Sequence, residues 1–160
     1  MWIKTADTSG DYIFTLGEGN GKQLGSYISS PNLFFGLFDG GWSGTTTSGQ
    51  SVVDNEWHHL AFVREGSTLS CYIDGISRGS TSNSTNLTTL AGGSTGGPFH
   101  IGGYSGGGNL DAYIDEVRIS KVARYTTNFD PPSLPFGGGL RMKDSDGKIY
   151  AVSLSGSVGE

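Results

Sequence analysis

Glycine divides this chain into short segments. It supplies 28 of the 160 residues and clusters at 39–41, 92–97, 102–108 and 137–139, while the stretches between are rich in Ile, Val, Phe, Tyr and Thr. β-Branched and aromatic residues favour strands, whereas glycine favours turns. No window of 12 or more residues keeps its apolar positions at helical spacing. The sequence therefore predicts an all-β protein, with at most one helical turn, at 121–125.

Many short strands in a chain of this length are typical of a two-sheet sandwich or jelly roll. We expect a two-sheet antiparallel jelly-roll sandwich over residues 1–130, a Pro- and Gly-rich linker at 131–139, and a C-terminal β-hairpin extension at 140–160 that turns at Asp146 and Gly147. The predicted strands cover residues 2–5, 11–17, 24–29, 33–38, 57–64, 69–74, 76–80, 99–102, 110–120, 139–143 and 148–154.

Charge and hydropathy argue against several partners. The formal net charge is −5 and the basic residues are scattered, so we expect no nucleic acid as a partner. No apolar run approaches the roughly 18 to 20 residues of a membrane span, the N-terminus lacks a signal-peptide pattern, and we expect no membrane partner. Cys71 is the one cysteine and cannot form an internal disulfide, so we expect it to be a small core residue.

Residues 56–75, EWHHLAFVREGSTLSCYIDG, place two histidines side by side. Neighbouring side chains of a strand point to opposite faces, so His58 and His59 do not readily share one metal ion. We expect a structural or hydrogen-bonding role for both, with catalysis by a single histidine as the alternative. The dipeptide Asp74-Gly75 favours a tight turn into a further strand.

The same stretch resembles the Trp-His-His strand and the hairpin ending in Tyr-x-Asp/Asn-Gly of laminin G-like domains, within the concanavalin A-like lectin/glucanase superfamily. Residues 99–132, FHIGGYSGGGNLDAYIDEVRISKVARYTTNFDPP, resemble the closing strands of that family. The resemblance covers about residues 2–132 and implies a concanavalin A-like fold. Relatives with the Ser-Lys, Ala-Arg-Tyr and Phe-x-Pro-Pro segments often belong to bacteriophage and other viral structural proteins, which implies a virion protein here.

Relatives usually carry further strands ahead of the segment MWIKT, at which this chain starts. A sandwich without those strands would have an exposed edge, and proteins normally cover such edges. We therefore expect the edge to be covered, either by the chain's own residues 148–154 or by a strand of another copy.

The resemblance also implies that ligands bind loops at the rim of the sandwich, often beside a calcium ion. Two loops, 38–49 and 102–111, carry suitable side chains. We predict that Trp42, Tyr104 and Asn109 contact a sugar ligand, and that Asp39 and Asp111 are candidate calcium ligands. The alternative is that Trp42 and Tyr104 only cap the core.

Enzymatic activity is not expected. The glucanases of this superfamily carry paired carboxylates in a Glu-x-Asp-x-x-Glu pattern, because glycoside hydrolysis needs an acid and a nucleophile. This chain has no such string. Asp111 and Asp115 could share one face of a strand, but the matching stretch of the family is structural.

Together these points predict a non-enzymatic virion structural protein, such as a tail, fibre, decoration or other surface component. We expect it to assemble with other virion subunits as a homo-oligomer and to bind host surface glycans. The alternative is a carbohydrate-binding, lectin-like module of a bacterial secreted protein, located outside the cell or at its surface. A degenerate glucanase is a third candidate.

Overall fold

The computed structural model describes residues 1–17, 22–86, 99–104 and 107–132, and the backbone of 140–143, 149–152 and 158–159. The chain divides into two compact units, Met1–Phe129 and Asp130–Glu160, and each is described by itself. Within the described residues every regular element is a strand. No helix there is both long enough and apolar enough to cross a membrane.

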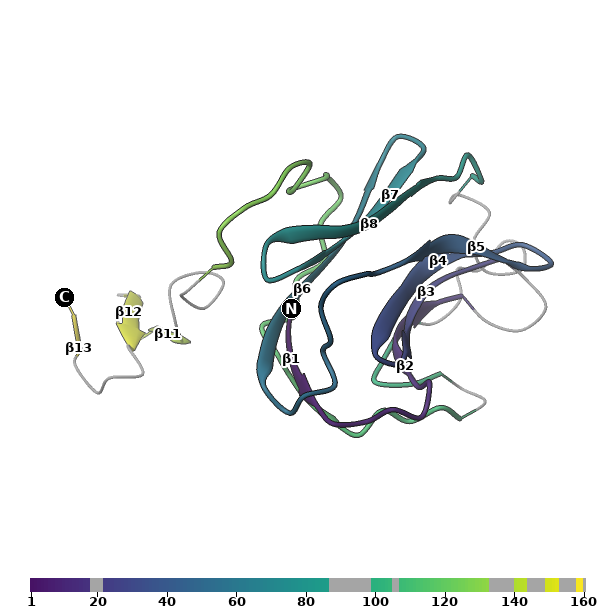
Figure 1. Ribbon diagram of the computed structural model, residues 1–160. Coiled ribbons are helices and arrows are strands. Elements are labelled where there is room, and N and C mark those ends of the chain that lie inside the picture. Colours follow the sequence, from purple (N-terminus) through teal and green to yellow (C-terminus); the bar gives the residue numbers. More distant parts are fainter. Residues whose placement is uncertain are drawn as a thin grey trace. The chain divides into compact units, whose positions relative to one another are not determined.

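The first unit consists of two antiparallel sheets of five strands, which confirms the predicted all-β sandwich (Figure 1). The first sheet has the order β10-β1-β6-β7-β8, formed by Ala112–Asp115, Trp2–Thr5, Trp57–Glu65, Thr68–Ile73 and Ile76–Ser82. The second has the order β5-β4-β3-β2-β9, formed by Trp42–Thr46, Asn32–Phe38, Gln23–Ser29, Tyr12–Leu16 and Phe99–Ile101.

One hydrophobic core fills the space between the sheets. In β4, Leu33, Phe35 and Leu37 are at most 2% exposed and alternate with outward-facing residues, as the period of a strand requires. They belong to one cluster with residues of the opposite sheet, namely Ile3, Leu60, Leu69, Cys71 and Ile73. Cys71 is fully buried there, as its position in the strand predicts.

A long irregular segment covers the outer face of the first sheet. Residues 117–129, here called the strap, place Ala123, Tyr125 and Phe129 against Ala61, Val63 and Tyr72. The strap ends at the β7–β8 turn, where the N–H of Phe129 donates to the carbonyl of Gly75 (2.9 Å).

One expectation for this region is wrong. The strand predicted at 110–120 is limited to Ala112–Asp115, because Glu116 adopts a left-handed backbone conformation (φ 51°) that ends the pairing. At 121–125, where at most one helical turn was expected, Lys121 and Val122 form a bend and no helix is present.

The strand β5 was not predicted, because its sequence Trp-Ser-Gly-Thr-Thr lies inside the stretch interpreted as a loop. It pairs with β4 along its whole length and closes one flank of the sandwich against β8. At this flank a Cβ on Gly79 would lie 2.6 Å from Oγ1 of Thr45 and 2.9 Å from the carbonyl oxygen of Thr46. Glycine at position 79 therefore lets the two sheets approach each other here.

The second unit contains its own three-stranded antiparallel sheet, with the order β11-β12-β13. These strands are Leu140–Lys143, Ile149–Val152 and Val158–Gly159. The predicted extension therefore has a third strand, and its predicted turn at Asp146 and Gly147 lies outside the described residues, as does most of the predicted linker.

The predicted use of residues 148–154 to complete the sandwich is wrong. Strand β12 is paired on both sides, with β11 and with β13. Strand β1 is likewise paired on both sides, with β10 and with β6. The N-terminal strand is therefore an inner strand, and the edges of the two sheets are formed by β10, β8, β9 and β5.

Candidate functional site

The outer face of the second sheet, turned away from the core, carries a cluster of aromatic rings that we call the aromatic face. Neighbouring rings in it have centroids 4.9 to 6.4 Å apart. Five rings are half-buried and the sixth, Tyr104, is 42% exposed. Its members are Tyr12, Tyr27, Phe34, Phe38, Trp42 and Tyr104.

A row of glycines lies beneath these rings. Gly25, Gly36 and Gly44 are opposite one another on β3, β4 and β5. A Cβ on Gly36 would lie 2.7 Å from the ring of Phe34, and a Cβ on Gly25 would lie 3.2 Å from the ring of Trp42. The absence of side chains in this row therefore allows the rings to lie down on the sheet.

The two aromatic residues predicted from separate loops belong to this one cluster. The ring of Tyr12 lies 6.4 Å from that of Trp42 and 5.0 Å from that of Tyr104. Burial raises the pKa of Tyr12 above its ordinary value, and the neighbouring Tyr104 and Tyr27 raise it further. Trp42 is the first residue of β5 and lies on the outer face, so it does not cap the core.

The third predicted sugar contact, Asn109, is exposed and lies in the same loop as Tyr104. This loop folds tightly: the N–H of Leu110 donates to the carbonyl of Gly102 (3.0 Å). A Cβ on Gly103 would lie 3.0 Å from Oδ1 of Asn109. The loop thus holds Asn109 near Tyr104, at the β9 side of the aromatic face.

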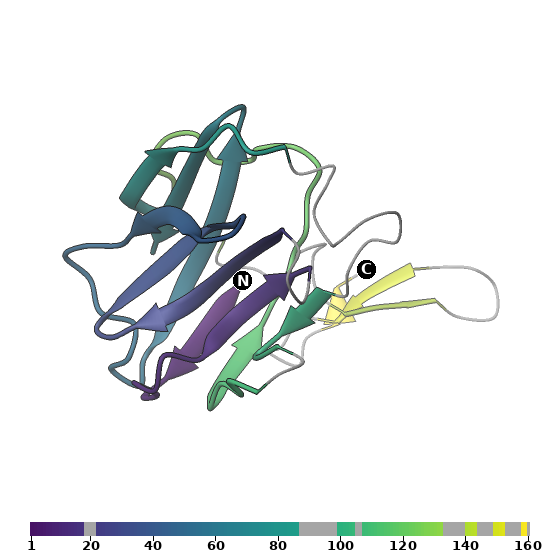
Figure 2. The same ribbon diagram turned by 90° about the vertical axis from the view of Figure 1, so that its right-hand side faces the viewer.

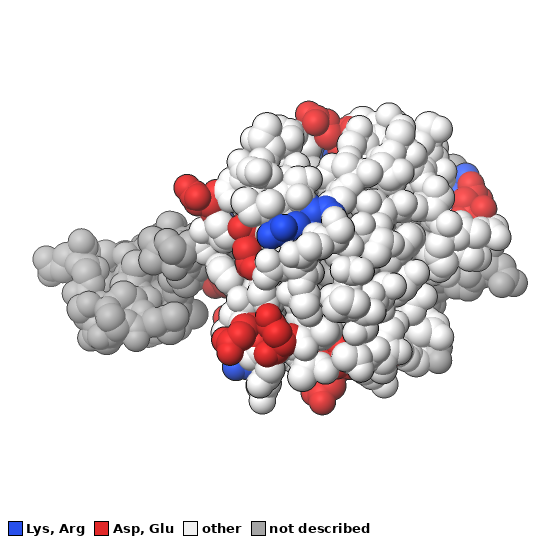
Figure 3. All heavy atoms as spheres, viewed as in Figure 1, with Lys and Arg blue, Asp and Glu red and all other residues white. Residues whose placement is uncertain are grey.

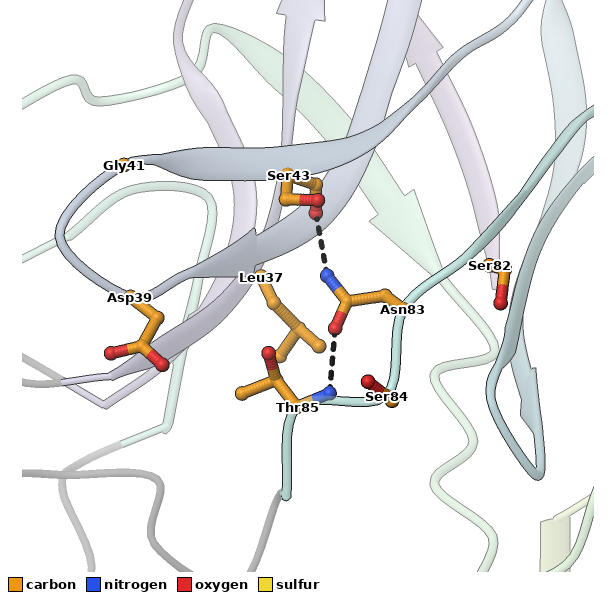
Figure 4. A pocket seen from close by; sticks show the side chains of 8 residues that line it. All are labelled: Leu37, Asp39, Gly41, Ser43, Ser82, Asn83, Ser84 and Thr85. Carbon is orange, nitrogen blue, oxygen red and sulfur yellow. Dashed lines mark hydrogen bonds between the residues drawn. The ribbon is translucent and has the colours of Figure 1, made fainter.

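A polar pocket of about 360 Å³ opens at the rim, between the β4–β5 turn and the residues that follow β8 (Figure 4). Asn83 organises it: its Nδ2–H donates to the carbonyl of Ser43 (3.3 Å), and its Oδ1 accepts the N–H of Thr85 (2.9 Å). The lining residues are Leu37, Asp39, Gly41, Ser43, Ser82, Asn83, Ser84 and Thr85.

Sequence reasoning identified Asp39 in this pocket but missed the 82–85 segment. Its Ser-Asn-Ser-Thr composition does not differ from an ordinary polar loop, and only the contact between Asn83 and β5 makes it part of a pocket. Gly41 and Ser43 flank Trp42 in the sequence, so the pocket and the aromatic face share the β4–β5 turn.

The two candidate calcium ligands do not meet. Asp39 follows β4 beside the Gln23 end of β3, and its carboxylate lies 3.1 Å from Nζ of Lys22. Asp111 lies at the other end of β3, where its N–H donates to Asp7 (3.1 Å) and the carbonyl of Asp11 accepts the N–H of Ile28 (2.9 Å). One calcium ion cannot bind both carboxylates.

Asp111 also belongs to an acidic group at that end of the sandwich. The hydroxyl oxygen of Ser9 lies within hydrogen-bond distance of the carboxylates of Asp7 and Asp11 (2.6 Å to Asp11), and the N–H of Ser9 donates to Asp7 (2.8 Å). These hydrogen bonds lower the pKa of Asp7 below its ordinary value. Among the described residues, no group of three or more His, Cys, Asp or Glu side chains has a geometry that could hold a metal ion.

The two adjacent histidines are buried on opposite faces of β6. His58 contacts two carboxylates: Nδ1 lies 2.7 Å from Asp74 and Nε2 lies 3.1 Å from Asp54. Burial alone would lower the pKa of His58, but the hydrogen bonds and charges of Asp74 and Asp54 outweigh it, so the pKa is raised above 6.5.

His59 has a different environment, beneath the strap. It is 1% exposed and packs edge-on against the rings of Trp2 (5.3 Å), Tyr125 (6.4 Å) and Phe129 (5.7 Å). Neither ring nitrogen has a hydrogen-bond partner. Burial, helped by the positive N-terminus, lowers the pKa of His59 to about 4. His58 is therefore held by hydrogen bonds to two carboxylates and His59 by packing against aromatic rings, and both side chains are buried.

Charged side chains on the face shown in Figure 3 lie in small separate groups, and most of this face is uncharged.

A family model described as the concanavalin A-like lectin/glucanases superfamily, of laminin G type, matches residues 1–127. The match covers both sheets and most of the strap, and it ends before the second unit. No curated protein matches the chain.

Proposed function

Because the chain belongs to the concanavalin A-like lectin/glucanase superfamily through its laminin G-like domain, we propose that it is a non-catalytic glycan-binding protein. The observation that carries this proposal is the meeting of Trp42 and Tyr104 on the aromatic face through Tyr12. Two side chains from distant parts of the sequence thus line one surface.

The aromatic face suits a sugar ligand. Tyrosine and tryptophan combine an apolar ring with a polar group, so one surface can contact the C–H face of a sugar and hydrogen-bond its hydroxyls. Tyr104 is the most exposed ring and Asn109 adds amide groups beside it. The rim pocket adds hydroxyls from Ser82, Ser84 and Thr85, beside the carboxylate of Asp39.

A hydrolytic role receives less support. Asp111 and Asp115 could share one face of a strand, but Oδ1 of Asp115 accepts the N–H of Glu116 (2.7 Å). Both lie in or next to β10 of the first sheet, whereas the aromatic face belongs to the second. We expect no hydrolysis of β-glucans, and an activity that disappears in Asp115→Asn would contradict this part of the proposal.

A glycan array followed by titration of the best-binding glycan tests the function. Tyr104→Ala should weaken binding by about tenfold, equivalent to about 1.4 kcal/mol, because it removes the most exposed ring. Tyr113→Ala is the matched control: this tyrosine is 71% exposed but lies on the other sheet. Chelators should leave binding unchanged, because Asp39 and Asp111 lie apart. Equal affinity of wild type and Tyr104→Ala would remove the aromatic face as the site.

A second candidate function is assembly on the surface of a virion, as a tail, fibre or decoration subunit. The observation that favours it is the separate three-stranded unit at Asp130–Glu160, which a simple lectin domain does not need. Immunogold labelling of purified virus particles with an antibody against the chain tests this role. Unlabelled particles would leave the lectin-like module of a secreted protein as the better assignment.

A further inference from the structure

The two flanks of the sandwich differ. At one flank β5 and β8 are in close contact, and the N–H of Ser48 donates to the carbonyl of Arg78 (3.0 Å). The opposite flank is formed by β9 and β10, the short green strands of Figure 2. Among the described strands, β9 pairs only with β2 and β10 only with β1. Each therefore has a backbone edge that no described strand covers.

The core is also incompletely covered at this flank. Phe99 and Ile101 of β9 are opposite Leu16 and Phe14, so they point to the same side of the sheet as the core residue Phe14. Phe99 is nevertheless 40% exposed and Ile101 44% exposed. Inward-facing apolar side chains with this exposure, next to an unpaired strand edge, are a feature that proteins normally cover.

The second unit has a strand edge of its own. Strand β11 pairs with β12 on one side and with no described strand on the other. Its sequence, Leu-Arg-Met-Lys, alternates apolar and basic residues. Strand β10 alternates in a matching way: Ala112 and Ile114 are half-buried toward the core, while Tyr113 and Asp115 are exposed, following the exposed Asp111.

We propose that β11 of a second copy of this chain adds to the edge of β10, joining the three-stranded sheet of one copy to the first sheet of the next. Side chains of paired strands that are in register lie on matching faces. An antiparallel register that places Leu140 opposite Ile114 and Met142 opposite Ala112 adds a strand of alternating apolar sequence to the flank where Phe99 and Ile101 are exposed.

Charge complementarity favours β11 as the strand that pairs with β10. In the same register Lys143 lies opposite Asp111 and Arg141 lies opposite Tyr113, diagonal to both Asp111 and Asp115. Two basic residues therefore share one face of the sheet with two acidic ones. The contact joins two different surfaces, so repeating it gives a closed ring, an open chain or a reciprocal pair of chains. The inference deepens the assembly role proposed above and does not depend on glycan binding.

Light scattering of the purified full chain, alone and as charge variants, tests the contact. Wild type should have the mass of at least two 16.8 kDa chains. The double variant Asp111→Lys/Asp115→Lys and the double variant Arg141→Glu/Lys143→Glu should each be monomeric, because like charges then meet. An equimolar mixture of the two should recover the assembly, since a basic strand of one variant then meets an acidic strand of the other at every β10–β11 contact. Recovery also shows that both variants are folded.

The matched control is Glu56→Lys/Glu65→Lys, which makes the same change of net charge at two exposed residues of the β6 ends; it should keep the wild-type mass. A monomeric wild type overturns the inference, as does an assembly that survives both double reversals or a mixture that stays monomeric. Absence of the chain from virus particles would overturn only the virion assignment.

Discussion

Oδ2 of Asp74 lies 2.7 Å from Nδ1 of His58, and Oδ1 of the same carboxylate accepts the N–H of His59 (2.8 Å). This carboxylate therefore fastens the β7–β8 turn to β6. Asp74 and Gly75 both have positive φ angles (51° and 77°), as a two-residue primed turn requires. The Trp-His-His strand and the Asp-Gly turn, which mark the family resemblance, are thus two halves of one structural contact.

Removing this carboxylate should destabilise the sandwich. Asp74→Asn should lower the free energy of unfolding by about 1–3 kcal/mol, because His58 loses a charged partner and a hydrogen bond becomes weaker. Urea denaturation monitored by fluorescence measures the change. Asp54→Asn is the control: the Asp54 side chain is 43% exposed, so its contact with His58 should contribute less than about 1 kcal/mol. An Asp54 effect as large as that of Asp74 would contradict the fastening role.

Acid should weaken the protein through His59. Its pKa is about 4 in the folded chain, whereas an unfolded histidine titrates near 6.5. The unfolded state therefore binds the proton first, and stability falls from pH 6.5 to about 4 by up to roughly 3 kcal/mol. The raised pKa of His58 acts oppositely, giving stability that is present below pH 6.5 and is lost as pH rises through the folded value.

Calorimetry between pH 7 and pH 4 separates the two histidines. His59→Leu keeps an apolar side chain beneath the strap and removes the titrating group, so its melting temperature should fall less than that of wild type over this range. If the melting temperatures of the two proteins fell equally between pH 7 and pH 4, His59 would not be the cause of the loss of stability in acid. His59→Ala should be less stable than wild type at every pH, because it leaves a cavity among Trp2, Tyr125 and Phe129.

The glycine row should not tolerate side chains. Gly36→Ala should destabilise the sandwich by about 1–3 kcal/mol, because its Cβ would lie 2.7 Å from both the Phe34 ring and the carbonyl oxygen of Ser43. Gly41→Ala is the matched control, since no atom lies within 4 Å of the Cβ it would add. Its effect on the melting temperature should be small. Equal stability of the two variants would mean that the rings do not pack on the row as described.

The thiol of Cys71 should be unreactive in the folded protein. The residue is 0% exposed and burial raises the pKa of its thiol above the ordinary value, so almost no thiolate forms at neutral pH. A thiol reagent should label the chain at the rate of global unfolding, and quickly in denaturant. Fast labelling without denaturant would show that the core opens locally around β7.

The sequence alone determined the local structure. Strand alternation predicted that His58 and His59 lie on opposite faces of β6, because side-chain direction in a strand depends only on position, and Cys71 was predicted as a core residue of β7. The Asp-Gly dipeptide likewise predicted the turn between β7 and β8, since its backbone preference is local. Glycine was a less reliable guide to turns. Gly44 lies within β5, so the interpretation of residues 38–49 as a loop missed this strand.

Only the tertiary structure decided which distant segments meet. Strand β1 lies between β10 and β6 in the sheet, and both of these strands follow it in the sequence by more than 50 residues. No local preference encodes that choice of partners. For the same reason the sequence predicted Trp42 and Tyr104 as separate ligand contacts on two loops. The structure shows that they belong to one cluster, because Tyr12 of β2 lies between their rings. Asp39 and Asp111 were equally plausible from sequence, and strand order placed them at opposite ends of β3. Strand order depends on how the whole set of apolar faces is buried, and that is a property of the complete fold.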